Sequence, residues 1–160
     1  LPHIDVLRNN GIKTVRQTID EVSVSGGPLR SYVERHRCSI PDVQPEKRDG
    51  VIEPYSTPYP SLSSPALPNG QRSEPRSLQV LPVHLRQWLH RRWLITQTKS
   101  AAKRDGYLHL WTHLFNISNE QQRRPLFQYL RRLAALRNES EVMIVPMRGL
   151  ADNMRETDNE

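Results

Sequence analysis

Proline placement limits how this chain can fold more than any other feature. Eight of its 13 prolines fall within residues 38–75, and none lies between residues 83 and 124. Proline lacks the backbone N–H that a helix interior or a central strand requires. We therefore expect residues 38–75 to form an extended or disordered linker that buries little apolar surface, with helices confined to its flanks.

Charge divides the chain in a similar way. The first 75 residues carry nine basic and nine acidic side chains, residues 76–138 carry twelve basic and two acidic ones, and residues 139–160 carry two and six. A block of net charge +10 favours acidic proteins, polyanions or anionic lipids. These patterns predict an N-terminal helical segment (1–37), a Pro-rich linker (38–75), a basic, aromatic-rich helical domain (76–138), and a short apolar segment with an acidic tail (139–160).

The basic block predicts three helices. The first runs from about Pro82 to Lys103, with proline tolerated in its first turn and Asp105-Gly106 closing it. Its buried stripe is expected to be Leu81, Leu85, Trp88, Leu89 and Ile95, with Arg86, His90, Arg91 and Arg92 largely outside.

The second predicted helix, from about Tyr107 to Asn116, has the clearest helical period in the chain. Its large apolar residues recur at i, i+3, i+4, i+7 and i+8. A third helix is expected to open at Ser118, to become regular near Arg124 because of Pro125, and to end at Asn138. Its inward residues are predicted to be Leu126, Tyr129, Leu130, Leu133 and Leu136.

Together these patterns predict a mainly α protein with a small three-helix domain at about residues 81–138. A core of that size is marginal on its own, which favours association with a partner or with a second copy. Near the N-terminus, Ile12, Val15, Ile19 and Val22 line one face of an expected weak helix, and the alternative for part of this stretch is a strand. A short helix is expected from Pro28 to about Arg37, and residues 142–145 are predicted to form a strand or a docking segment.

Arginine dominates the basic block, and the whole chain has 19 arginines against 4 lysines. Guanidinium groups bind phosphate and carboxylate through two parallel hydrogen bonds, so the bias suits recognition; coding bias would produce the same excess. The alternatives for this surface are a solvated helix face, nucleic acid or an acidic protein. Candidate binding residues are Arg91, Arg92, Arg123, Arg124, Arg131, Arg132 and Arg137, with Trp93 and Tyr129 as stacking or interface residues.

Signs of catalysis or cofactor binding are absent from the sequence. His109 and His113 have a spacing that suits zinc on a helix, but two ligands make an incomplete site, so we expect no metal and no cofactor. Cys38 is the single cysteine, and no phosphate-binding, dinucleotide or serine-hydrolase motif occurs. We therefore expect the protein not to be an enzyme.

The leading hypothesis is a helical interaction or adaptor protein that binds a partner protein through the basic module. Its Arg, Pro and Leu content would suit a viral accessory or regulatory protein. The alternative is an RNA- or DNA-binding subunit of a ribonucleoprotein assembly, and a third possibility is membrane-surface association. One cysteine and no apolar leader predict an intracellular, reducing compartment, cytoplasm or nucleus, with the chain neither secreted nor transmembrane.

Overall fold

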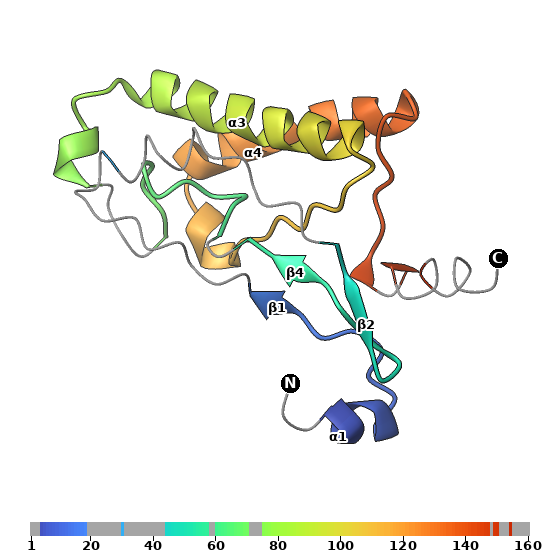
Figure 1. The fold of residues 1–160 in the computed structure, drawn as a ribbon. Coiled ribbons are helices and arrows are strands. Elements are labelled where there is room, and N and C mark those ends of the chain that lie inside the picture. The colour runs from blue at the N-terminus through green and yellow to red at the C-terminus, as the bar shows by residue number, and fades with distance from the viewer. Residues whose placement is uncertain are drawn as a thin grey trace.

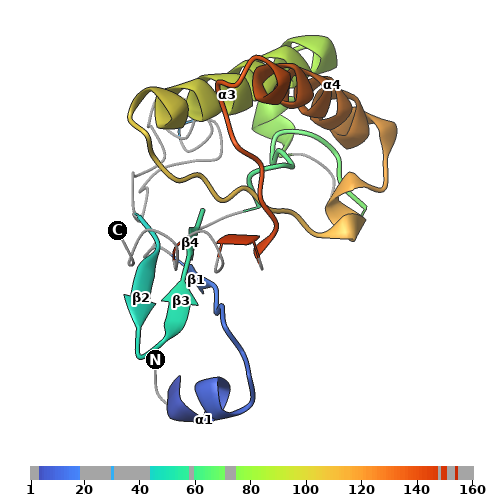
Figure 2. The same ribbon diagram turned by 90° about the vertical axis from the view of Figure 1, so that its right-hand side faces the viewer.

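Two long helices form one layer of the molecule, and extended segments and small strands lie beneath them (Figures 1 and 2). The computed structural model describes residues 4–18, 30, 44–57, 60–70, 75–147, 149–150 and 154. The fold is mainly α, as the sequence predicted. Its elements are α1 (Ile4–Asn9), β1 (Gln17–Thr18), β2 (Glu46–Arg48), β3 (Val51–Glu53), β4 (Tyr55–Ser56), η1 (Arg76–Leu78), α3 (Val83–Lys103), η2 (Leu114–Ile117) and α4 (Glu120–Asn138).

Helix α3 matches the predicted first helix closely. Pro82 is its N-cap, where the missing N–H costs nothing. At the other end, the Gly106 N–H bonds the Ala101 carbonyl and the Asp105 N–H bonds the Ala102 carbonyl, which is a Schellman motif. The left-handed position of the motif belongs to Asp105 (φ 51°), one residue before the predicted glycine cap.

The buried face of α3 agrees with the prediction only in part. Four of the five residues of the predicted stripe, all except Trp88, are half-buried, but the fully buried side chains lie elsewhere on the helix. Trp88 is 42% exposed, whereas Arg86 and His90 are 2% and 3% exposed and were expected outside. The Arg86 guanidinium is drawn inward because it donates to the Ala66 carbonyl (2.5 Å) in the Pro-rich segment. The buried face of α3 is therefore Arg86, His90, Trp93, Leu94, Gln97, Thr98 and Ala101.

Helix α4 begins four residues earlier than the predicted regular helix. Asn119 caps it, its side chain accepting from the Gln122 N–H (3.1 Å), so the expected Ser118 capping box is displaced by one residue. Pro125 does not delay the helix. Proline at this position leaves the Gln121 carbonyl without its intrahelical donor, and Gln87 Nε2 of α3 donates to that oxygen instead (3.1 Å).

Helices α3 and α4 pack side by side and run in the same direction (Figure 1). Gln87 bonds Gln121 near both N-termini, and the Thr98 hydroxyl meets the Tyr129 hydroxyl (2.9 Å) further along. Tyr129 also packs in a cluster with Trp93 and Leu94. Four of the five residues predicted to face inward on α4 are buried or half-buried, and Leu130, at 41% exposure, is the exception.

The predicted second helix is wrong, because residues 107–113 are extended and only the short η2 follows them. The backbone of this extended segment forms hydrogen bonds with the Pro-rich segment. The Trp111 carbonyl accepts from the Leu62 N–H (3.1 Å), and the His109 carbonyl accepts from the Thr57 N–H (3.4 Å). The Trp111 indole also donates to the Thr57 carbonyl (2.7 Å). These tertiary bonds override a strong local helical period.

The Pro-rich segment is part of the core, so the prediction that it buries little is wrong for its described residues. Val51, Ile52, Ala66 and Leu67 are at most 3% exposed. The side-chain amide of Gln122, itself 1% exposed, holds the segment against α4. Its Oε1 accepts from the Ser64 N–H (2.9 Å), and its Nε2 donates to the carbonyls of Ser64 (2.7 Å) and Leu67 (2.9 Å).

The N-terminal region meets the same segment through short strands. β1 pairs in parallel with β4, β2 pairs antiparallel with β3, and Thr14 bridges Ile52. The helix expected through Ile12 and Val15 is absent; Gly11 (φ 73°) turns the chain after α1, and residues 12–18 are extended or strand. Ile19, Val22 and most of the helix expected from Pro28 lie outside the described residues. Residues 142–145 form no strand.

Replacing Gln122 by methionine should destabilise the protein by at least ~2 kcal/mol. Methionine preserves the volume but removes three hydrogen bonds. The Ser64 N–H and the Leu67 carbonyl are left without a partner, each costing ~1–3 kcal/mol, whereas the Ser64 carbonyl still accepts from the Leu67 N–H. Chemical denaturation measures the loss. The control is Gln121→Met, whose side chain is exposed; equal stability of the two variants would contradict the role of the Gln122 amide.

Gly70→Ala should also be strongly destabilising. The Gly70 N–H donates to the Phe115 carbonyl (2.7 Å), and a Cβ at Gly70 would lie 2.1 Å from that oxygen and 2.3 Å from the Ser118 hydroxyl. Backbone must move to relieve this overlap, which costs about 1–3 kcal/mol. Ser118→Ala in the Gly70→Ala background should restore little of the lost unfolding free energy, because the carbonyl clash remains; full recovery would place the strain on the hydroxyl.

Candidate binding surface

Five of the seven arginines predicted to form a binding surface are exposed. Arg92, Arg123, Arg124, Arg131 and Arg137 are exposed on α3 and α4, and no ion pair involves them among the described residues. Arg92 lies over the Trp88 ring, 5.2 Å from its centroid. Nothing in the described chain neutralises these five guanidinium groups.

The other two predicted arginines are partly committed to the fold. Arg91 is half-buried and donates to Gln128 Oε1 (2.9 Å), which ties α3 to α4. Arg132 forms an ion pair with Glu139 (3.2 Å), the first residue of the acidic C-terminal stretch. Their charge still adds to the local field, but their donors are less available for a partner.

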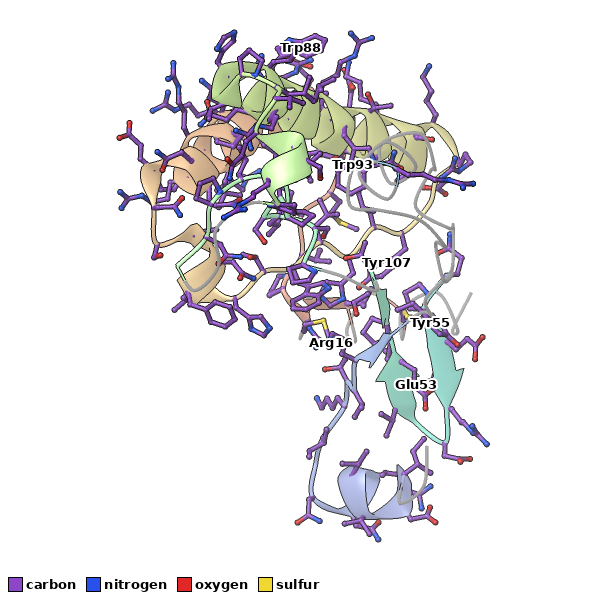
Figure 3. The ribbon with its side chains drawn as sticks, turned by 90° about the vertical axis from the view of Figure 1, so that its left-hand side faces the viewer. Arg16, Glu53, Tyr55, Trp88, Trp93 and Tyr107 are labelled. Atoms are coloured by element: carbon purple, nitrogen blue, oxygen red, sulfur yellow. The ribbon has the colours of Figure 1, made fainter. Side chains whose placement is uncertain are left out.

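Large apolar side chains stand among the free arginines. Trp88 on α3 and Phe127 and Leu130 on α4 are 42%, 54% and 41% exposed. Trp88 points away from the extended segments and Trp93 points toward them (Figure 3). We call the exposed residues Trp88, Arg92, Arg123, Arg124, Phe127, Leu130, Arg131 and Arg137 the outward face.

The two predicted stacking residues do not belong to this face. Trp93 is 6% exposed and Tyr129 is 2% exposed, both within the core between the helices and the extended segments. Burial of Tyr129 raises the pKa of its hydroxyl, and the hydrogen bond with Thr98 partly offsets that shift. Neither ring can stack on a ligand in this fold. The exposed aromatic residues of the helical layer are Trp88 and Phe127 instead.

His109 and His113 are not one helical turn apart, as the sequence predicted, because their segment is extended. In an extended segment, residues four apart are separated by about 13 Å, at about 3.3 Å per residue, rather than by one helical turn. Trp111 lies between them, and its ring contacts His113 edge to face (5.1 Å). Within the described residues, no group of three or more potential metal ligands is gathered.

A row of rings on this extended segment was not predicted from the sequence. Tyr107–His109, Trp111–His113 and His113–Phe115 make ring contacts at 6.3, 5.1 and 4.9 Å. Between the rings, Leu110 packs on the core cluster of Trp93, Leu94 and Tyr129. The signal was present as strict alternation of aromatic and mostly aliphatic residues over 107–115, which has the period of a strand.

Arg16 joins the row from the N-terminal region, its guanidinium lying 4.7 Å from the Trp111 ring centroid. Burial, and secondarily the charge of Arg16, lower the pKa of His109 below its usual 6.5. Its Nδ1 is buried without a hydrogen-bond partner. Burial also raises the pKa of Tyr107 to about 12. The row is therefore a structural junction that favours the neutral forms of Tyr107 and His109.

No family model, curated protein or solved structure matches the chain. Among the helices in the described ranges, none combines the length and the apolar content needed to cross a bilayer.

His109 should make stability depend on pH. Since its folded-state pKa is depressed, protonation favours the unfolded chain, so stability is fully present above about pH 6.5 and falls as the pH drops through the unfolded-state value. The unfolding free energy of His109→Gln, measured between pH 7.5 and 5, should fall less than that of the unmodified protein. His84→Gln, at an exposed site on α3, serves as the control; equal pH slopes in all three proteins would contradict this assignment.

Proposed function

We propose that this protein is a non-enzymatic interaction protein that binds an acidic surface of a partner protein through the outward face of α3 and α4. The observation that carries the proposal is the coincidence of unpaired arginines with exposed large apolar side chains on one layer. Among the described residues of α3 and α4, five exposed arginines lack an ion pair, and Trp88, Phe127 and Leu130 stand among them.

The chemistry of this face resembles that of protein interfaces. Tryptophan, other aromatic residues and arginine are enriched where proteins bind one another, because they bury large area and form directional hydrogen bonds. Each of the two helices presents an aromatic residue followed four positions later by arginine: Trp88 and Arg92 on α3, and Phe127 and Arg131 on α4. Such like charge is costly until an acidic partner neutralises it.

A nucleic acid would be attracted by the same charge. That alternative is weakened because the two rings expected to stack on bases, Trp93 and Tyr129, are buried. The exposed side chains of Phe127 and Leu130 on α4 suit an apolar protein contact better than a phosphate backbone.

The proposal also places the protein in a reducing compartment, since a single cysteine offers no internal disulfide.

Charge reversal on α4 tests the proposal. The tagged full-length chain, Arg124→Glu/Arg131→Glu and a control with the same charge change, Arg76→Glu/Lys103→Glu, are used to capture proteins from nuclease-treated extract of the source cells. Both control residues are exposed and lie outside the outward face. We expect the control to retain the captured partner and the α4 variant to lose at least tenfold of it, ~1.4 kcal/mol in binding.

The proposal is wrong if the two double variants capture equally, because general charge would then explain binding. A partner that is captured from untreated extract but not from nuclease-treated extract, together with an RNA affinity that falls steeply with salt, would assign the face to nucleic acid instead.

A further inference from the structure

Helix α4 carries two stripes of the same spacing. The inner stripe is Gln122, Leu126, Tyr129, Leu133 and Leu136, all buried or half-buried. Shifting each position by one residue gives an outer stripe in which every residue is exposed: Arg123, Phe127, Leu130, Ala134 and Arg137. Both stripes follow the alternating four- and three-residue intervals of a coiled-coil seam. We call the outer stripe the outer seam.

The outer seam lies on a free edge of the helical layer. One residue corresponds to about 100° of helix rotation, so the outer seam lies about a quarter turn away from the buried one. Helix α3 is on the opposite side, because its bonds to α4 reach Gln121 and Gln128. A further helix placed on the outer seam would extend the layer beyond α4 without displacing α3.

The seam has an apolar centre and basic ends. Phe127 and Leu130 are 54% and 41% exposed, and Ala134 follows them. Arg123 and Arg137 terminate the seam about 21 Å apart, at about 1.5 Å per residue over fourteen residues. Arg124 and Arg131 flank it one heptad apart, at positions where coiled coils place the charges that select a partner.

This charge pattern argues against a second copy of the chain. Two outer seams in either parallel or antiparallel pairing would bring arginines opposite arginines. None of these four arginines has an ion pair among the described residues, so no carboxylate in that part of the chain would relieve the repulsion. A partner helix with carboxylates at matching positions would relieve it.

We propose that the outer seam binds an amphipathic, acidic α-helix of the partner protein. The inference rests on the proposed function, and it specifies the structural element through which the partner binds. Apolar residues at the a and d positions of that helix pack on Phe127, Leu130 and Ala134. Carboxylates one heptad apart accept from Arg124 and Arg131, and acidic residues near the ends of the helix meet Arg123 and Arg137.

Two peptides of equal composition separate helix recognition from general attraction. The patterned peptide has three heptads, about 21 residues, with leucine at a and d and glutamate at e and g, so that its own like charges keep it monomeric. The permuted peptide has the same residues with the leucines spread evenly around the helix. Fluorescence anisotropy measures the binding of each labelled peptide to the full-length chain.

We expect the patterned peptide to bind at least tenfold more tightly than the permuted one. Phe127→Ala/Leu130→Ala should weaken the patterned peptide at least tenfold, because both residues are exposed and their loss removes the apolar centre without altering the core. The control, Val80→Ala/Leu114→Ala, removes two apolar residues that are 75% and 85% exposed elsewhere. It should bind the patterned peptide within twofold of the unmodified protein.

Equal affinity for both peptides, no binding of either, or insensitivity to Phe127→Ala/Leu130→Ala would overturn the inference. If the peptides bind equally and Arg124→Glu/Arg131→Glu weakens both, an acidic partner remains supported and only its helical element is wrong. If charge reversal changes neither affinity, the proposed function fails as well. The inference would also be overturned if an RNA oligonucleotide bound more tightly than the patterned peptide and its affinity were unchanged by Phe127→Ala/Leu130→Ala.

Discussion

The side-chain amide of Gln122 joins two parts of the chain that are 55 to 58 residues apart, and much of the architecture depends on this contact. Its three hydrogen bonds satisfy backbone groups of a Ser- and Pro-rich segment that has no sheet or helix to satisfy them. With these groups paired, Ala66 and Leu67 can be buried beneath the helices. The guanidinium of Arg86 supports the same segment from α3 by bonding the Ala66 carbonyl.

Local signals in the sequence were sufficient for the two long helices. Proline near the start, a basic last turn and a left-handed C-cap set the limits of α3, and the apolar period placed most of the inner face of α4. The errors in assigning the buried faces of these two helices have a shared cause. Arg86, His90 and Gln122 are polar residues whose burial depends on partners far along the chain, and hydrophobic periodicity assigns such residues to solvent.

The segment at residues 107–115 shows how two periods can coexist in one stretch. Its apolar residues fit a helical face, while its rings alternate with the period of a strand. Hydrogen bonds from the backbone N–H groups of Thr57 and Leu62 favoured the extended form, because extended backbone there satisfies polar groups of a proline-containing neighbour that cannot form a regular sheet. The candidate surface was predictable to a similar degree. Five of the seven arginines named from the sequence are exposed, but identifying the aromatic residues beside them required the rotation of each helix.

The parallel course of α3 and α4 has a consequence for how the chain folds. Two antiparallel helices can close through a short turn, whereas parallel helices need a connection that returns along their whole length (Figure 2). Three carbonyls of that connection, residues 104–119, accept from the backbone N–H groups of Thr57, Leu62 and Gly70, which precede both helices in the sequence. Native contacts therefore have large sequence separation for a mainly helical protein, and such topologies fold more slowly than helical hairpins.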